Sequence, residues 1–352
     1  MANGIKQGQH RLVEGVIKKG LCVRCGACVS LCPYMDYFDG KVVVMDQCQA
    51  ETWRCLQLCP VADYSGTVPV YEESSGAKTA MGPFLKVITA RSMDEEVRQS
   101  AQYGGVVSTL LIYALEKGEL EAAVLTGRGG DFAPAGIPAR DRSTVLKCAG
   151  SRYSASASLS VVNRAIKAGE ERLGVVGLPC QMEALARMKR LTPDGEERSR
   201  HITLKIGLFC TWAVDYRLLE GFLEKEGLRE RVRKYDIPPP PSEEFQVFTT
   251  SGERKIFPLS QVRPFVQPGC ALCRDMTAEW ADISVGTVEG LEGWNTVVVR
   301  SADGARLVDG AVKDGWIETG DLPKEALEHL QEAARNKGER GKTARMQIGR
   351  GE

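Results

Sequence analysis

The sequence predicts an α+β protein with a small cysteine-rich domain at its N-terminus, an α/β domain with a mainly parallel sheet, and a smaller β-rich part. Seven of the twelve cysteines lie within the first 60 residues. From about residue 84, short apolar runs typical of strands alternate with helical patterns, which favours parallel strands covered by helices. From Val232 onward the pattern changes to short strands and turns, and this change predicts the β-rich part.

The composition excludes several classes of protein. Lys+Arg and Asp+Glu each number 46, so a net charge of zero gives no reason to expect nucleic acid or an anionic membrane as a partner. No apolar run reaches the ~18 residues of a membrane span. The first residues also lack the apolar stretch of a signal peptide. We therefore expect a cytoplasmic protein, in which thiols stay reduced.

The first domain is organised around one closely spaced run of cysteines. Cys22, Cys25, Cys28 and Cys32 are separated by two, two and three residues and are followed by Pro33, a spacing typical of bacterial ferredoxins. This run predicts a ferredoxin-like iron–sulfur domain that transfers electrons through [4Fe-4S] clusters. Structural zinc and a disulfide framework are the alternatives, but zinc prefers two separated pairs of ligands, and disulfide frameworks belong to short secreted chains.

A second cysteine motif predicts a second cluster in the same domain. Cys55 and Cys59, the latter before Pro60, repeat the closing half of the first run, and Cys48 precedes them. In a two-cluster ferredoxin the ligands of the two clusters interleave. The expected sets are Cys22, Cys25, Cys28 and Cys59 for one cluster, and Cys32, Cys48 and Cys55 for the other.

The second of these sets is one cysteine short. Its vacant place falls near Glu51 or Thr52, so the site could hold a [3Fe-4S] cluster, use Glu51 as an oxygen ligand, or take a thiolate from elsewhere. A short strand is expected at 41–45, between the two motifs. Residues 61–83 contain prolines and a Ser-Ser-Gly tract and are expected to be a linker, so that a domain 1–75 packs independently of the rest.

The α/β domain is expected to extend over residues 84–335. Its strands are predicted at 84–90, 122–125, 173–176, 202–209 and 296–299, and its helices from 94, at 106–117, 159–168, 180–189, 215–226 and 307–312, and from 323. Two short runs, 245–248 and 255–257, flank Ser251-Gly252 and predict a hairpin. Residues 336–352 form a basic tail, which we interpret as a solvated or disordered end; docking on an acidic partner is the alternative.

Four of the five remaining cysteines form a second set. Cys180 and Cys210 each follow a predicted strand, and the carboxyl ends of parallel strands share one edge of a sheet, where open α/β proteins bind ligands. Cys180 also begins a helix, where the helix dipole favours a thiolate. Cys270 and Cys273 are separated by two residues. Small buried thiols are the alternative for the first two, and a redox disulfide or zinc for the pair.

Ordered sequence matches make the chain similar to a known family over residues 84–335. The matching stretches are 104–108, 113–115, 149–153, 178–181, 206–210, 269–275, 281–288 and 293–296. They resemble the beta subunits of coenzyme F420 hydrogenase and dehydrogenase. The resemblance implies that this part is a flavoprotein domain with FAD and one [4Fe-4S] cluster, that FAD exchanges hydride with coenzyme F420, and that Cys180, Cys210, Cys270 and Cys273 hold the cluster. Cys148 is left without a role.

The same resemblance identifies candidate FAD-binding residues. They are Gly104, Gly105, Val106, Val107, Ser108, Gly150, Ser151, Arg152 and Tyr153. Two glycines before a helix suit phosphate binding, because the backbone approaches closely and the first N–H groups point at the anion. A tight turn, or a solvated loop for the second stretch, explains the residues without a ligand. Trp294 is a further candidate for stacking on flavin, with a buried core position as the alternative.

We expect an iron–sulfur flavoprotein, a subunit of a larger redox complex, that passes electrons between clusters and FAD and exchanges hydride with coenzyme F420. No side-chain acid or base is required, so no catalytic residue is predicted. The alternatives are a ferredoxin-fed reductase of another substrate and an electron-wiring subunit, as in hydrogenase, formate dehydrogenase or heterodisulfide reductase complexes. Expected partners are other redox subunits or ferredoxin and a small hydride acceptor.

Overall fold

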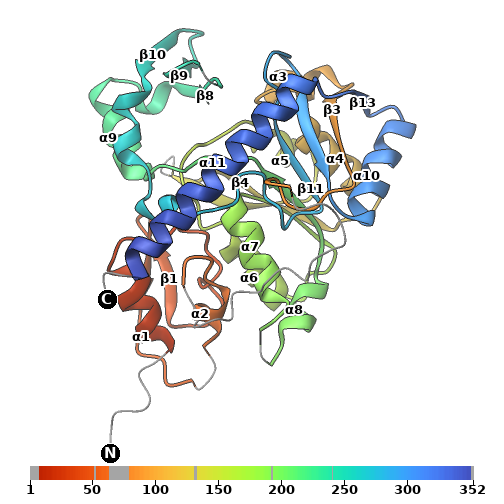
Figure 1. Cartoon of the computed structure of the whole chain (residues 1–352). Helices are drawn as coiled ribbons and strands as arrows, with labels where there is room; N and C mark the ends of the chain where they lie inside the picture. Colours follow the sequence, from red (N-terminus) through yellow and green to blue (C-terminus); the bar gives the residue numbers. More distant parts are fainter. Residues whose placement is uncertain are drawn as a thin grey trace, which may run out of the picture.

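One large mixed β-sheet forms the centre of the structure (Figure 1). The structure is a computed structural model, and it describes residues 8–50, 53–62, 79–130, 133–191, 193–239 and 241–349. Its strands are β3 (Lys86–Ser92), β4 (Ala122–Arg128), β5 (Pro134–Ala139), β6 (Leu173–Gly177), β7 (Ile202–Leu208), β11 (Ile283–Thr287), β12 (Asn295–Val299) and β13 (Ile317–Gly320). In the described part of the chain these eight strands pair in the order β13-β3-β12-β11-β7-β6-β4-β5. All five strands predicted for this domain are present in this sheet.

The prediction of a mainly parallel sheet is wrong. Only three of its pairings, β4 with β6, β6 with β7 and β7 with β11, are parallel. The pairings of β5 with β4, β12 with β11, β3 with β12 and β13 with β3 are antiparallel. Helices cross over between β4, β6 and β7, whereas short connections join β4 to β5 and β11 to β12, and such connections produce antiparallel pairs.

Helices pack on this sheet at positions that the sequence determines. They are α3 (Glu95–Ser100), α4 (Val106–Glu116), α5 (Arg142–Lys147), α6 (Leu159–Lys167), α7 (Pro179–Met188), α8 (Gly195–Arg200) and α10 (Ala302–Lys313). Asp94, Asp141 and Ser301 cap α3, α5 and α10, because each side chain accepts a hydrogen bond from a backbone N–H of the first turn. The almost wholly apolar α4 is buried against β3, α5 and α10 in the main core.

The β-rich part is a small antiparallel sheet with its own hydrophobic cluster. Its strands β8 (Val232–Asp236), β9 (Glu244–Thr249) and β10 (Arg254–Pro258) pair in the order β10-β9-β8. The predicted hairpin is therefore confirmed. Helix α9 (Tyr216–Lys225) packs beside this sheet. Single turns η2 (Arg229–Arg231), η3 (Leu259–Gln261), η4 (Arg263–Phe265) and η5 (Pro268–Leu272) connect it to the main sheet.

The N-terminal unit consists of short elements around the cysteine runs. They are α1 (Gly8–Leu12), the π-helical turn η1 (Val13–Ile17), β1 (Met35–Phe38), β2 (Lys41–Val44) and α2 (Arg54–Leu58). The predicted strand at 41–45 is β2, which pairs antiparallel with β1. A separate cluster that includes Leu12, Val29 and Leu56 forms the core of this unit.

The N-terminal unit and the α/β part share buried surface, contrary to the expectation that they pack independently. One hydrophobic cluster contains Ala27 and Leu58 from the first and Leu159 and Met182 from the second. The fully buried Asn163 of α6 donates 2.8 Å hydrogen bonds to the carbonyl oxygens of Ala27 and Val29. Most of the predicted linker, 63–78, lies outside the described residues.

Helix α11 (Lys324–Gly349) replaces the predicted basic tail. Residues 336–349 continue this helix, which extends from the main sheet to the N-terminal unit (Figure 1). Lys337 is buried in it, so this segment is not a solvated end. The sequence of this segment shows that it is charged, but the residues that bury part of it lie far away in the sequence and could not be identified from the charges. Neither α11 nor any other helix in the described ranges is long and apolar enough to cross a membrane.

Substitution Asn163→Ala tests the attachment of the N-terminal unit. The change leaves the carbonyl oxygens of Ala27 and Val29 unpaired, and it removes the acceptor of a 2.7 Å hydrogen bond from Arg198. We expect the free energy of unfolding in urea to fall by about 2 to 5 kcal/mol. Lys167→Ala, an exposed change on the same helix, is the control. A loss no larger than that of the control would contradict this role of Asn163.

Candidate functional site

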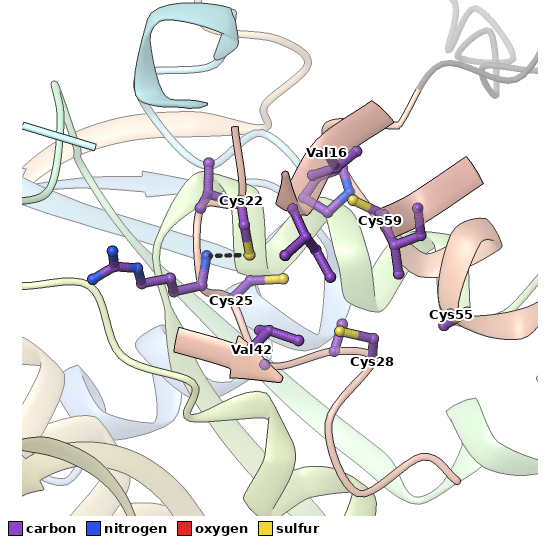
Figure 2. A pocket seen from close by; sticks show the side chains of 14 residues that line it. Val16, Cys22, Cys25, Cys28, Val42, Cys55 and Cys59 are labelled. Carbon is purple, nitrogen blue, oxygen red and sulfur yellow. Dashed lines mark hydrogen bonds between the residues drawn. The ribbon is translucent and has the colours of Figure 1, made fainter. Parts of the chain in front are cut away.

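Five cysteines of the N-terminal unit line one small cavity: Cys22, Cys25, Cys28, Cys55 and Cys59. We call Cys22, Cys25, Cys28 and Cys59 the first cysteine group, and Figure 2 shows their sulfur atoms directed toward a common space. The first three lie on the loop after η1, and Cys59 follows α2. The rest of the wall is mainly apolar and includes Leu12, Val16 and Val42.

Burial keeps the thiols of the first group protonated in the metal-free chain. It raises the pKa of Cys22 to about 11, with a further contribution from the neighbouring Cys59. Burial likewise raises the pKa values of Cys25, Cys28 and Cys59. A cationic centre that binds here must therefore displace protons, as thiolate ligation requires. Buried sulfur donors in an apolar wall fit an iron–sulfur cluster.

The second cysteine group is Cys32, Cys48 and Cys55. Burial raises the pKa of Cys55 to about 12, and the nearby thiols of Cys32 and Cys48 add to the increase. These three cysteines therefore lie together, as their spacing predicted. The proposed fourth position, Glu51 or Thr52, lies outside the described residues.

The third cysteine group is Cys180, Cys210, Cys270 and Cys273. Cys180 lies in the first turn of α7, directly after β6, and Cys210 follows β7. Because β6 and β7 are parallel and pair Gly177 with Gly207, both cysteines lie at the same sheet edge, which confirms the sequence prediction. Cys270 lies in η5 and Cys273 directly follows it.

The thiols of the third group are mutual neighbours. Burial raises the pKa of Cys180 well above its usual range, and nearby cysteines raise it further; they are Cys25, Cys273, Cys210 and Cys270. Cys25 belongs to the first group, so the first and third groups are adjacent. In the described ranges, no three His, Cys, Asp or Glu side chains have the geometry of a single-ion site. The groups are thus sets of neighbouring thiols.

Backbone contacts and an ion pair attach the loop of the first group to the α/β part, beside the third group. The chain at Gly26 lies directly against Ala157, and the chain at Gly269 lies against Leu21, so that neither position has room for a side chain. Arg24 donates a 2.7 Å hydrogen bond to Asp215. Burial opposes ionisation of Asp215, but this hydrogen bond and the Arg24 charge outweigh it and lower the pKa of the carboxyl group.

Helix α11 covers the third group with one face. Lys337 Nζ donates a hydrogen bond to the carbonyl oxygen of Cys210, and Arg345 donates one of 2.8 Å to that of Leu272. Between them, Gly341 lies against the backbone of Cys273. These three residues are four positions apart and therefore lie on the same side of the helix. Arg345 also donates to the carbonyl oxygen of Pro60, beside the first group.

A large pocket adjoins the third group. It has a volume of about 740 Å³, within the range of pockets for cofactor-sized ligands. Residues at the carboxyl ends of β4, β6, β7 and β11 line it, as expected for an open α/β sheet. Cys210 belongs both to this wall and to the third group.

The first predicted ligand-binding stretch lies in the pocket wall, with one exception. Gly105, Val106, Val107 and Ser108 line the pocket, whereas Gly104 does not. Gly105 is the N-cap of α4 and has a φ of 79°, which favours glycine. The α4 N-terminus therefore faces the pocket. The Val106 N–H donates to Asn295 Oδ1, so the next N–H groups of the first turn, those of Val107 and Ser108, could bind an anion.

The second predicted stretch also lines the pocket, in a strained conformation. Gly150, Ser151, Arg152 and Tyr153 are all in the wall, and Tyr153 has a φ of 55°. Its hydroxyl donates to Asp236 at 3.4 Å, as does that of Tyr103 at 3.0 Å. This hydrogen-bonded cluster connects the pocket wall to the β-rich part.

Several wall residues were not predicted. The pocket wall also includes Cys148, Gln102, Lys337 and Arg340. The predicted stacking candidate Trp294 does not line the pocket. It is half-buried beside Arg91, whose guanidinium lies 4.8 Å from the centre of the Trp294 ring. The positions of Lys337 and Arg340 could have been suspected from the glycines among the charged residues of α11, because glycine permits close backbone approach.

Comparisons with known proteins agree over the α/β part. Two models of one family, coenzyme F420 hydrogenase/dehydrogenase, match the chain: the N-terminal model of the beta subunit at residues 87–163 and the C-terminal one at residues 170–325. The coenzyme F420 hydrogenase subunit beta of Methanosarcina barkeri is 32% identical over 263 residues, which cover 73% of this chain and 89% of the relative.

A second relative and a solved structure extend this likeness. One subunit of the F(420)H(2) dehydrogenase of Methanosarcina mazei is 28% identical over 324 residues, 90% of this chain and 89% of that protein. A chain of the F420-reducing [NiFe] hydrogenase complex from Methanosarcina barkeri has a TM-score of 0.71 and 29% identity, covering 76% of this chain and 94% of its own.

Substitution Arg24→Ala tests the ion pair between the first and third groups. It leaves the Asp215 carboxylate without its main partner in a site where the two side chains are only 10% and 13% exposed. We expect a loss of about 3 to 5 kcal/mol in the free energy of unfolding. The double variant Arg24→Met with Asp215→Asn should lose less, because no charge remains buried and the asparagine still accepts the hydrogen bond from the Arg217 N–H that caps α9. Equal losses in the single and double variants would contradict this explanation.

Proposed function

Because the chain belongs to the family of coenzyme F420 hydrogenase/dehydrogenase beta subunits, we propose that it is an F420-linked redox subunit. Its three cysteine groups hold iron–sulfur clusters, its large pocket holds FAD, and the reaction is hydride exchange between FAD and coenzyme F420. The first and third groups hold [4Fe-4S] clusters. The second group holds either a [3Fe-4S] cluster or a [4Fe-4S] cluster with a ligand outside the described residues.

The observation that carries the proposal is that Cys210 belongs to both the third cysteine group and the pocket wall. The third group adjoins the first through Cys25, and the first adjoins the second through Cys59 and Cys55. The thiols thus form an unbroken series from the N-terminal unit to the pocket. Such a series supports the transfer of single electrons along the chain.

The pocket residues fit FAD by their chemistry. Gly105 lets the backbone approach a phosphate, and the N–H groups of Val107 and Ser108 in the first turn of α4 can donate to the phosphate oxygens. Arg152 adds a positive charge, and its Nε atom is buried without a partner in the described part of the chain. When bound, a flavin supplies the conversion between single electrons and hydride.

The chain's own residues have no acid–base task in this proposal. The Tyr103 and Tyr153 hydroxyls donate to Asp236 and hold the second pocket stretch against the β-rich part. Burial raises the pKa values of both tyrosines, so they remain hydrogen-bond donors at neutral pH. Their role is to shape the pocket, and we assign no catalytic residue.

The identity of the substrate and partners rests on the relatives. The relatives described above are an F420 hydrogenase subunit and an F(420)H(2) dehydrogenase subunit, and the solved neighbour is a chain of a hydrogenase complex. We therefore propose other redox subunits as partners. A ferredoxin-fed reductase of another substrate and an electron-wiring subunit remain the alternatives.

Cofactor content and one reaction test the proposal. Protein purified without oxygen should contain FAD and about eleven to twelve irons per chain. Mixed with reduced coenzyme F420, it should bleach its flavin absorbance within a single turnover. Iron and flavin without this bleaching would favour the reductase of another substrate. Iron without flavin would favour the wiring subunit, and zinc in place of iron would contradict the proposal.

Two glycines at opposite ends of α4 offer a matched test of the FAD site. Gly105 and Gly118 have φ values of 79° and 70°, so alanine is strained at either position, by about 1 to 2 kcal/mol. An added Cβ at Gly105 would lie 3.0 Å from Val97, whereas Gly118 faces open space. Gly105→Ala should weaken FAD binding at least tenfold with iron content unchanged.

Gly118→Ala should lose comparable stability and keep its FAD. Both variants are compared with the unsubstituted protein by flavin released on denaturation and by urea unfolding. FAD retained fully in Gly105→Ala, or lost equally in both variants, would show that the α4 N-terminus does not bind the cofactor.

A further inference from the structure

Lys337 is a buried cation at the boundary between the third cysteine group and the large pocket. Its side chain belongs to the pocket wall, and the residue is only 3% exposed. Its Nζ atom donates to the carbonyl oxygen of Cys210. Lysine is almost never fully buried unless anionic groups compensate its charge. The groups that act on it are the thiols of Cys210, Cys273 and Cys270 and the carboxyl group of Asp275.

The Asp275 carboxyl group is hydrogen-bonded to the backbone and not to Lys337. Its two oxygens accept 2.9 Å hydrogen bonds from the backbone N–H groups of Thr277 and Glu279. In the ranges that the structure describes, no carboxylate forms an ion pair with Lys337. The groups that can compensate the lysine charge are therefore the sulfur atoms of the third group, when they are deprotonated, and the Asp275 carboxyl group, none of which forms an ion pair with it.

The cations near the first group are arranged differently. Arg24 forms an ion pair of 2.7 Å with Asp215. Arg187, which donates to the carbonyl oxygen of Cys59, forms one of 2.6 Å with Glu183. Each arginine charge is thus cancelled by a carboxylate. Among the described residues, the third group alone has a buried lysine without such a carboxylate.

Helix α11 holds Lys337 in place. Gly341 lies against the Cys273 backbone, and Arg345 donates to the carbonyl oxygens of Leu272 and Pro60. These contacts anchor the helix on both sides of the third group's loop. The ammonium group therefore cannot withdraw into solvent without displacing the helix, and its charge stays fixed relative to the sulfur atoms.

We propose that the fixed positive charge of Lys337 raises the reduction potential of the cluster held by the third cysteine group above that of the first. The inference rests on the proposed function, because it requires a cluster in that group. Reduction adds one electron, with no bond broken and no proton taken up. A nearby cation in a buried site stabilises the added negative charge. The cluster beside the pocket then accepts an electron more readily than the first group does.

Redox titration of the complete, cofactor-loaded protein, followed by electron paramagnetic resonance, tests the proposal. Lys337→Gln removes the charge and keeps a hydrogen-bond donor. We expect one cluster to become at least tenfold harder to reduce, a shift of about 59 mV for a one-electron couple, with the other clusters unchanged. Lys337→Arg, which keeps the charge, should restore the potential. Lys342→Gln, an exposed change on the same helix, is the matched control and should have no effect.

The outcomes separate this inference from the proposed function. Protein that contains no iron would overturn both the proposed function and the inference about Lys337. Unchanged potentials in an iron-loaded Lys337→Gln variant overturn the inference and leave the proposed function intact.

A second neutral variant, Lys337→Met, covers the case in which the glutamine variant does not fold. If both neutral variants fold but lose the iron of one cluster while Lys337→Arg keeps it, Lys337 holds the cluster in place, and the proposal that it sets the potential is overturned.

Discussion

The contact between the first and third cysteine groups is the constraint on which the rest of the structure depends. The Gly269 backbone lies against that of Leu21 at this contact, and the Gly26 backbone lies against that of Ala157 beside it, so neither glycine can carry a side chain. The Arg24–Asp215 pair pairs two buried charges near this contact, and Asn163 satisfies the carbonyl oxygens of Ala27 and Val29 where the first group's loop meets α6. An independently packed N-terminal unit could not keep the two sets of thiols adjacent, because relative domain motion is the default when an interface is small.

The same constraint explains the positions of the pocket and of α11. Parallel strands β6 and β7 bring Cys180 and Cys210 to one sheet edge, where the wider pocket opens beside Cys210. That edge would be exposed if nothing covered it. Helix α11 covers this edge with one face. On that face Lys337 and Arg345 donate hydrogen bonds to backbone carbonyl oxygens, and Gly341 between them packs against the backbone. The third cysteine group, the pocket wall beside it and α11 therefore belong to one buried region.

The sequence predicted the features that depend on local patterns. Cysteine spacing grouped the thiols of the N-terminal unit, and strand positions placed Cys180 beside Cys210. What it missed depends on distant contacts. Strands β5, β11 and β13 were not expected, and the outer pairs proved antiparallel, because strand order is decided by connections and burial that no short pattern encodes. The charges of α11 resemble those of a solvated helix until the surface that buries Lys337 is known.

Magnetic coupling between the pocket ligand and the third cysteine group tests the central claim most directly. In the cofactor-loaded protein, the electron paramagnetic resonance signal of a one-electron-reduced flavin should relax much faster when the neighbouring cluster is paramagnetic, because Cys210 belongs to both sites. The account predicts strong relaxation enhancement that disappears when the cluster is converted to its diamagnetic state. A flavin signal whose microwave saturation is the same in both cluster states would contradict the account, since the two centres would then not be neighbours.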